Sequence, residues 1–431
     1  MCAEKYYYKI TLRHRLLYLY FLLFIFLWTY QEGIYRDKVF SIPGHAFLLF
    51  TVVSLLIINL KNKYVPKLDK KCIACFIIFN VWSSLLAVFE GEFLSAYVTG
   101  GGQILLFLCF YNFVIFYNLK KTEYVVHFIN MLIILSVVSV MVALYVFAFG
   151  GFSLGMIKIQ QPSFGGGGRL TGWYGSPNNL APVFAVAIIA TLFKLSRQQY
   201  FLLSKKWSIV YSIIIFINFI GLILTGSRGT WVAFAIGLML FLILNFSKII
   251  SKPKNTIKIL LSILSLSIST IILLSYIGYD LGSFMQQFVR PDKITAQLDF
   301  YNRGWGRAYY WRESFELMRT ADISTALFGY GLSGFMEIVN RSSHSGFLTV
   351  AVDRGLIALL LFLMLIYYLF KDSILNLKQS SIKFFSICLL TFLMIKNTTT
   401  VDIPWNTFPG IVFVMTLLLI SMKDDSPRLK R

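Results

Sequence analysis

Long apolar runs, separated mostly by short polar segments, form the dominant pattern along this chain. About twelve of these runs are long enough to cross a bilayer, because a spanning helix uses about 20 apolar residues. The pattern therefore predicts an all-α integral membrane protein with about 12 transmembrane helices. The runs lie at about 15–31, 44–60, 72–89, 94–117, 126–149, 178–195, 208–225, 230–247, 258–278, 346–370, 382–397 and 408–422.

Composition excludes a water-soluble globular protein. Hydrophobic residues make up 57% of the 431 positions, charged residues make up 14%, and the mean hydropathy is +0.72. Soluble domains are about 45–50% apolar. The first apolar run ends in Leu27-Trp28-Thr29-Tyr30 without a small-residue cleavage site, so we expect it to remain as a span.

The five cysteines predict neither a disulfide framework nor a metal site. Cys2 lies near the N-terminus, and Cys109 and Cys388 lie within apolar runs. Cys72 and Cys75 form a C-x-x-C pair at the start of an apolar run, with no second Cys or His pair nearby. We therefore interpret both as buried thiols.

Basic residues indicate the orientation of the spans. The chain carries 40 Lys and Arg against 19 Asp and Glu, a net charge of +21 that in a soluble protein would suggest nucleic-acid binding. With the N-terminus in the cytoplasm, 26 basic residues fall inside and 14 outside, and eight of these 14 belong to one long outer loop and the start of the next span. The positive-inside rule therefore predicts cytoplasmic N- and C-termini, and the charge requires no nucleic acid.

Two outer segments are too long to be simple turns. Segment 150–177 contains four consecutive glycines, and segment 279–345 separates spans 9 and 10. Loops of this length usually carry function. The predicted organisation is 1–278 for spans 1–9, 279–345 for a large periplasmic loop, and 346–431 for spans 10–12 and a cytoplasmic tail.

His344 is the only histidine of the large outer loop and the first candidate for chemistry. It follows Ser342-Ser343 and directly precedes an apolar run, so a serine can cap the helix that starts there while the imidazole lies at its positive end. A helix N-terminus disfavours imidazolium and keeps a histidine able to accept a proton. The alternative is an interfacial histidine hydrogen-bonded to lipid headgroups.

Arginines accompany the other outer helix starts. Arg228 lies in a tight turn between two spans, and Arg169 precedes Ser176-Pro177-Asn178, a sequence typical of a helix start. Helices therefore begin beside an Arg or His near Pro177, Gly229 and Ser345. A helix N-terminus attracts anions, and a guanidinium binds phosphate through two parallel hydrogen bonds. These arginines are candidate phosphate ligands; the alternative is snorkelling to lipid headgroups.

Arginines and aromatic rings alternate between Tyr301 and Trp311. Arg303 and Arg307 lie in this stretch. Guanidinium groups bind phosphates and aromatic faces stack on pyranose rings, so the mixture suits a sugar diphosphate. Trp305–Arg319 also has the period of a helix lying at the membrane interface, where an aromatic belt would explain the rings without a ligand.

Motifs for nucleotide-driven or metal-dependent chemistry are absent from the sequence. It contains no Walker loop, dinucleotide fingerprint, H-E-x-x-H motif or nucleophile elbow. No Asp, Glu and His set has metal-ligand spacing in the sequence. We therefore expect turnover without a metal ion or a cofactor.

In their order and sidedness, these motifs resemble the superfamily of bacterial O-antigen ligases and O-antigen polymerases. The matching positions are Arg169-Leu170-Thr171-Gly172, Thr225-Gly226-Ser227-Arg228, Arg307, Phe328-Gly329-Tyr330-Gly331, and His344 with Gly355 eleven residues on. The resemblance extends over about residues 165–375. It implies inverting, metal-independent glycosyl transfer from an undecaprenyl-diphosphate-linked glycan at the periplasmic face. It also implies that Arg228, Arg307 and His344 are essential, with Arg169 and Arg303 as further candidate diphosphate ligands.

The spacing between arginines and glycines distinguishes the ligases from some of the polymerases of the superfamily. Some polymerases carry an arginine with a glycine eleven residues later in each of two outer loops. That glycine is missing after each of Arg169, Arg228, Arg303, Arg307 and Arg319. We therefore expect a ligase that transfers a polysaccharide from undecaprenyl diphosphate to a lipid A-core acceptor in the bacterial inner membrane. A surface-polysaccharide polymerase is the alternative, and a lipid-linked oligosaccharide flippase ranks third because the charges lie at loops and span ends.

In the expected reaction, Arg228 and Arg307 hold the diphosphate leaving group while His344 orients or deprotonates the acceptor hydroxyl. An acidic residue could instead be the base. The acidic candidates are Asp299, Glu313, Glu316 and Asp353.

Overall fold

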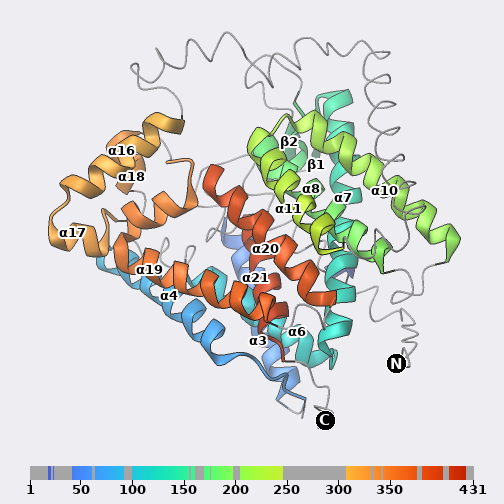
Figure 1. The fold of residues 1–431 in the computed structure, drawn as a ribbon, viewed down its shortest axis with the longest axis horizontal. Helices are drawn as coiled ribbons and strands as arrows, with labels where there is room; N and C mark the ends of the chain where they lie inside the picture. Colours follow the sequence, from blue (N-terminus) through green and yellow to red (C-terminus); the bar gives the residue numbers. More distant parts are fainter. Residues whose placement is uncertain are drawn as a thin grey trace. The chain divides into compact units, whose positions relative to one another are not determined.

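The structure is a computed structural model of the chain (Figure 1). It forms two compact units, one containing Ile129–Asp299 and the other containing Tyr35–Phe128 and Phe300–Arg431. The residues that the structure describes are 18–20, 23, 41–60, 64–91, 100–154, 157–160, 169–174, 176–197, 204–245, 307–331, 334–340, 343–375, 381–400 and 407–423.

The first unit is built around α8 (Pro177–Ser196), which is buried along most of its length. α8 packs against α10 (Lys205–Thr225) and α11 (Arg228–Leu244). The unit also contains the second part of α7 (Lys121–Phe149) and the short 3₁₀ helix η3 (Gly172–Tyr174). α8 is rich in alanine, and small residues let neighbouring membrane helices approach closely.

A short β-hairpin is an exception to the helical pattern. β1 (Gly151–Leu154) pairs antiparallel with β2 (Ile157–Gln160) within the outer segment predicted at 150–177. Apolar and polar residues alternate in β2, which is the period of a strand. Four residues are too few for this period to stand out in the sequence.

The second unit is a bundle joined by aromatic contacts. Phe79 and Phe362 stack with ring centroids 5.2 Å apart, and Phe128 meets Phe385 at 6.0 Å. Its helices are α3 (Ser41–Asn59), α4 (Lys70–Phe89), α6 (Gly102–Phe116), the start of α7, α16 (Arg307–Thr320), α17 (Ile323–Phe328), α18 (Gly334–Val339), α19 (Gly346–Ile374), α20 (Ser381–Thr399) and α21 (Phe408–Ser421).

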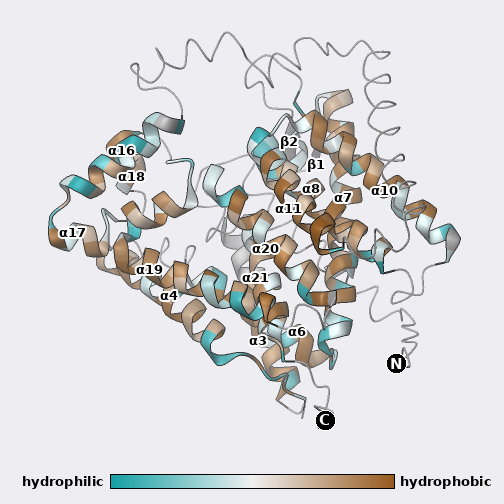
Figure 2. Cartoon of the chain, in the orientation of Figure 1, coloured by the Kyte–Doolittle hydropathy of each residue, from teal (hydrophilic) through white to brown (hydrophobic). Residues whose placement is uncertain are grey.

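The prediction of a helical protein with several spans is confirmed for the parts of the chain that the structure describes. Figure 2 shows apolar residues along much of these helices. The helices with the length and hydropathy of membrane spans are Lys70–Phe89, Lys121–Phe149, Pro177–Ser196, Lys206–Thr225, Gly346–Ile374 and Ile382–Thr399. Shorter apolar helices occupy Leu48–Asn59, Gly102–Phe116, Arg228–Leu244 and Phe408–Ser421, where further spans are predicted.

Some of the predicted elements lie outside the described residues. These are the apolar run at 258–278, the loop from 279 to 306, and most of the run at 15–31. The total of 12 spans therefore stays a prediction. The rest of the large outer loop contains α16, α17 and α18, and α16 is the helix predicted at Trp305–Arg319.

Gly355 divides α19 into two helical pieces. Its φ of +78° and ψ of 176° form a backbone conformation that is essentially restricted to glycine. A Cβ atom at this position would overlap the carbonyl oxygen of Leu327 at the end of α17. Both the conformation and the close approach therefore require glycine.

The loop between α17 and α18 fills the break in α19. The N–H of Tyr330 donates to Val352 O at 2.8 Å, and the N–H of Gly331 donates to Asp353 O at 3.1 Å. In an unbroken helix, these carbonyls would accept from residues one turn further on. The Phe328-Gly329-Tyr330-Gly331 motif therefore caps the first piece of α19.

Replacing Gly355 with alanine is expected to lower the thermal unfolding midpoint of the purified protein. Alanine at a positive φ destabilises the folded protein by about 1–2 kcal/mol, and its methyl group is forced against backbone atoms of α17. Gly91→Ala is the matched control, because Gly91 has a φ of +76° but open space around its Cα. An equal loss in the two variants would show that the close approach to Leu327 contributes nothing.

Candidate functional site

The turn between α10 and α11 places Arg228 at a helix start. Gly226 ends α10 in the left-handed conformation, with φ of +56°, and Ser227 is the N-cap of α11. Only these two residues separate the helices, so Arg228 becomes the first residue of α11. Its side chain is exposed.

Arg169 lies across this turn. Its Nε donates to Thr225 O at 2.8 Å, and its Nη2 donates to Gly226 O at 3.1 Å. A Cβ atom at Gly226 would lie 3.3 Å from the Arg169 Nε, so a small residue is needed beneath the guanidinium. Arg169 therefore satisfies carbonyl groups at the C-terminus of α10 and supports the turn that carries Arg228.

Two helix N-termini meet beside this turn. α8 begins at Pro177 with Ser176 as its N-cap, as the sequence predicts. The Ser227 hydroxyl donates to Asn178 Oδ1 at 2.9 Å and pairs with the Thr230 hydroxyl at 2.9 Å. The first turns of α8 and α11 are therefore tied together, and their positive dipole ends reinforce each other next to Arg228.

His344 lies directly before α19 in the second unit. Its φ of +53° is unusual for a residue with a side chain, and the side chain is half-buried. Its imidazole lies beside the Tyr310 ring of α16, with ring centroids 5.7 Å apart. The predicted helix start is confirmed, since α19 begins at Gly346.

The serine cap predicted for α19 differs from the one observed. The N-cap is Ser345, and its side chain makes no capping hydrogen bond. The Ser343 hydroxyl instead accepts from the N–H of Ser345 at 3.2 Å and pairs with the Thr349 hydroxyl at 2.6 Å. The left-handed backbone of His344 brings Ser343 back over the helix start, and this fold of the chain was not evident in the sequence.

Arg307 lies on the same face of α16 as the residue that contacts His344. Arg307 is the first residue of α16, and Tyr310 and Ser314 follow on the same face at three and seven residues. Ser314 is completely buried, and Tyr310 contacts the imidazole. Arg307 therefore begins the helix face that packs toward His344. The neighbouring face, about 100° round the helix from Ser314, exposes Phe315, as a helix at a membrane surface would.

Tyr310 is a further candidate residue, and the sequence reasoning did not single it out. It lies in the aromatic stretch Tyr309-Tyr310-Trp311, where no ring differs visibly from its neighbours. The spacing of three residues from Arg307 was the available signal. The candidate residues Arg303 and Asp299 and the cap candidate Ser342 lie outside the described residues.

Comparison with protein families agrees with these motifs. Residues 213–363, about a third of the chain, match the family model described as O-Antigen ligase. This segment of the chain is similar to the O-antigen ligase family. No curated protein matches it. The segment matched to the O-antigen ligase family contains Arg228, Arg303, Arg307 and His344, whereas Arg169 lies before it.

The family match supports a broad functional assignment. Together with the apolar helices, it identifies a multi-pass membrane protein with an O-antigen ligase- or polymerase-type function. The family consists of membrane glycosyltransferase-like proteins, so the chain is assigned as an enzyme. The two described units each contribute candidate residues: Arg169 and Arg228 in one, Arg307, Tyr310 and His344 in the other.

Two of the acidic alternatives to His344 have other contacts. Glu316 forms an exposed ion pair with Arg319 at 2.7 Å. The Asp353 carboxylate is buried and accepts from the N–H of Phe335 at 3.0 Å, at the start of α18. Asp299 lies outside the described residues. These contacts favour His344 over Glu316 and Asp353 as the base.

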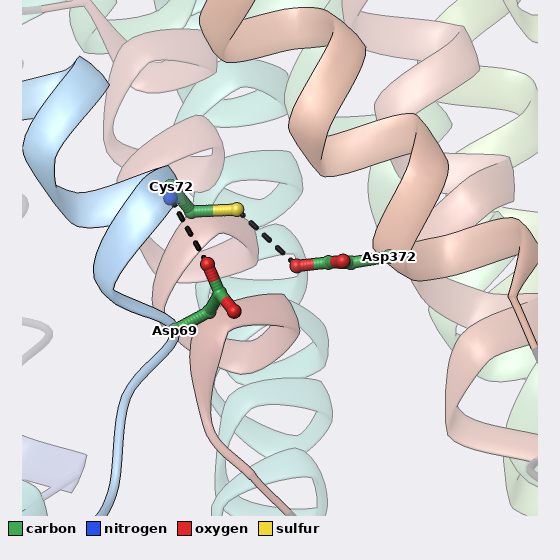
Figure 3. A group of neighbouring side chains, drawn as sticks. All are labelled: Asp69, Cys72 and Asp372. Carbon is green, nitrogen blue, oxygen red and sulfur yellow. Dashed lines mark hydrogen bonds between the residues drawn. The ribbon is translucent and has the colours of Figure 1, made fainter.

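A further cluster lies at the far ends of α4 and α19 from His344. Figure 3 shows Asp69, Cys72 and Asp372, whose potential ligand atoms lie within 4.8 Å of one another. Asp69 Oδ1 caps α4 by accepting from the N–H groups of Lys71 and Cys72 at 2.9 and 3.2 Å. The Cys72 thiol donates to Asp372 Oδ2 at 3.4 Å. A helix cap and a contact between α4 and α19 therefore account for the three side chains.

Proposed function

We propose that this protein is an O-antigen ligase of the bacterial inner membrane. It transfers a polysaccharide from undecaprenyl diphosphate to a lipid A-core acceptor at the periplasmic face, with both chain termini in the cytoplasm. The main support for the proposal is the packing of Tyr310 against His344. Because Arg307 begins the same helix face as Tyr310, that face lies toward a histidine at a helix start. This contact supports a phosphate ligand and a proton acceptor in one part of the large outer loop.

The arginines supply the charge that the leaving group needs. Arg228 is exposed beside two joined helix N-termini, and Arg307 begins α16. A guanidinium about 4 Å from a phosphate charge contributes about 4 kcal/mol at an effective dielectric constant of about 20, before desolvation is subtracted. Two such contacts favour departure of the diphosphate without a general acid.

The reaction is a single displacement at the anomeric carbon of the donor. The acceptor hydroxyl forms the new glycosidic bond, and the bond between the anomeric carbon and the phosphate oxygen breaks. His344 takes the proton of the hydroxyl, and undecaprenyl diphosphate leaves with the bonding electrons. Attack opposite the leaving group inverts the configuration at this carbon.

Deletion of the gene is expected to leave long polysaccharide on undecaprenyl diphosphate. A ligase acts after polymerisation, so its loss stops only the last transfer. Gel electrophoresis of the lipid-linked glycans and of lipopolysaccharide measures the result, and restoring the intact gene is the control. Accumulation of single repeat units on undecaprenyl diphosphate would instead identify a polymerase and reject the ligase.

Chelation of divalent ions is expected to leave glycan transfer unchanged. In the proposed site, arginines neutralise the negative charge of the diphosphate, so no bridging metal ion is required. The test measures transfer by purified protein with and without EDTA, together with its thermal unfolding midpoint. Loss of transfer in EDTA that magnesium or manganese restores, at an unchanged midpoint, would contradict the arginine-based account.

A further inference from the structure

The segment from α17 to Gly331 lies against the sides of two candidate spans. The Phe328 ring stacks on Trp82 of α4 with centroids 5.6 Å apart. The following residues fill the break in α19, where Tyr330 N donates to Val352 O. Figure 1 shows α17 close to α4 and α19. This part of the large outer loop therefore contacts the spans below their ends.

The antiparallel pairing of α4 and α19 shows how far these contacts lie from the helix ends. Cys72 meets Asp372 at one end of the pair, and Arg354 donates to Ser83 at 2.8 Å further along. Trp82 lies seven residues before the end of α4, and Val352 lies six residues after the start of α19. At 1.5 Å per residue, both positions are about 10 Å inside the helix ends on the side of His344.

Apolar side chains of α17 are exposed next to these contacts. Ile323 is 82% exposed, and Leu327 and Phe328 are 38% and 45% exposed. Along the same end of α4, Leu85 and Phe89 are 45% and 84% exposed. Exposed apolar side chains of a membrane span face lipid, and burying such a surface is favourable by about 25 cal/mol per Å². Leu85 and Phe89 lie on the same face of α4 as Trp82, on which the half-exposed Phe328 stacks, so apolar residues of α17 border this surface.

The backbone of the segment is compatible with a membrane environment. Irregular backbone at membrane depth requires partners for its polar groups. Gly329 N donates to Thr325 O at 2.8 Å, and the next two N–H groups bond to the carbonyls that the break in α19 leaves unpaired. Asp322 is the N-cap of α17, and hydrogen bonds from Thr325 hold the pKa of its carboxyl group below the usual value. An ionised Asp322 suits a start at the water boundary.

We propose that Asp322–Gly331 is a re-entrant segment whose apolar face lies among the acyl chains of the leaflet on the side of His344. Acyl chains are the proposed occupant because Phe328 packs on α4 beside exposed apolar residues of that candidate span. The Tyr330 hydroxyl donates to Leu317 O of α16 at 2.9 Å. The segment therefore anchors the helix that carries Arg307 and Tyr310 at the membrane surface. This inference does not depend on which glycan is transferred.

Spin-label accessibility in proteoliposomes of the full chain tests the proposal. Single cysteines replace Ile323 or Leu327 in a Cys2→Ser background, since Cys72, Cys75, Cys109 and Cys388 are buried and poorly labelled. Nitroxide relaxation by oxygen reports lipid, and relaxation by a nickel chelate reports water. Leu360→Cys, on an exposed position of α19, is the lipid reference, and Arg319→Cys, on an exposed position of α16, is the water reference.

The proposal expects oxygen to exceed the nickel chelate at positions 323 and 327 several-fold, as at Leu360. A preference for the nickel chelate at both positions, as at Arg319, would place the segment in water and overturn the proposal. Low accessibility to both reagents would show that protein covers this face, and would overturn lipid as its occupant. Ile323 is largely exposed, so its replacement tests the surface without disturbing the core.

Discussion

Replacing His344 with asparagine is expected to lower glycan transfer by about 10²-fold or more while leaving donor binding unchanged. The imidazole is the proposed acceptor of the hydroxyl proton, and asparagine has no basic nitrogen. His344 has a φ of +53°, a left-handed conformation that asparagine adopts more readily than alanine does. The asparagine variant therefore removes the base with little disturbance of the turn. Donor binding and single-turnover transfer should be measured on one preparation.

Two comparisons separate chemistry from structure at this position. His344→Ala removes the imidazole and also destabilises the turn, because alanine is unfavourable at a positive φ. Asn340→Ala is its matched control, because Asn340 is exposed and has a φ of +55°. Loss of donor affinity in proportion to rate would place His344 in the diphosphate site. Unchanged binding and transfer would identify an interfacial histidine, and the base would be sought among Asp299, Glu313, Glu316 and Asp353.

Replacing either Arg228 or Arg307 with alanine is expected to abolish transfer and leave the thermal unfolding midpoint almost unchanged. Both are first residues of helices and are not fully buried, so neither fills the core. Lysine at either position should also impair transfer, because an ammonium lacks the planar fork that binds phosphate through two hydrogen bonds. Transfer by purified variants and binding of the undecaprenyl-diphosphate-linked donor measure both effects.

Arg319→Lys is the control for charge on the outer helices. Arg319 is exposed on α16 and pairs with Glu316, and such surface pairs contribute only about 0–1 kcal/mol. The variant should keep its transfer activity. Near-normal transfer by the combined Arg228→Lys and Arg307→Lys variant would reject the bidentate contact and favour arginines that only snorkel to headgroups.

The positions of the helices could be predicted from the sequence because they depend on residues close together in the chain. An apolar run of sufficient length predicts a span, and capping residues predict its first turn. The starts predicted near Pro177, Gly229 and Ser345 agree with observed starts at Pro177, Arg228 and Gly346. The ordered motifs also led to the superfamily that the family match confirms. Each of these conclusions needs only residues close together in the chain.

The tertiary structure alone decided which side chains meet. Arg169 and Arg228 both looked like phosphate ligands in the sequence, yet Arg169 bonds to carbonyls at the end of α10 whereas Arg228 is exposed. Likewise, Cys72 meets Asp372 across 300 residues, and Gly355 makes room for the end of α17. An arginine that stabilises a turn and an exposed arginine have the same side-chain chemistry. They differ only in the acceptors that packing of distant segments brings to them, and no local pattern encodes that packing.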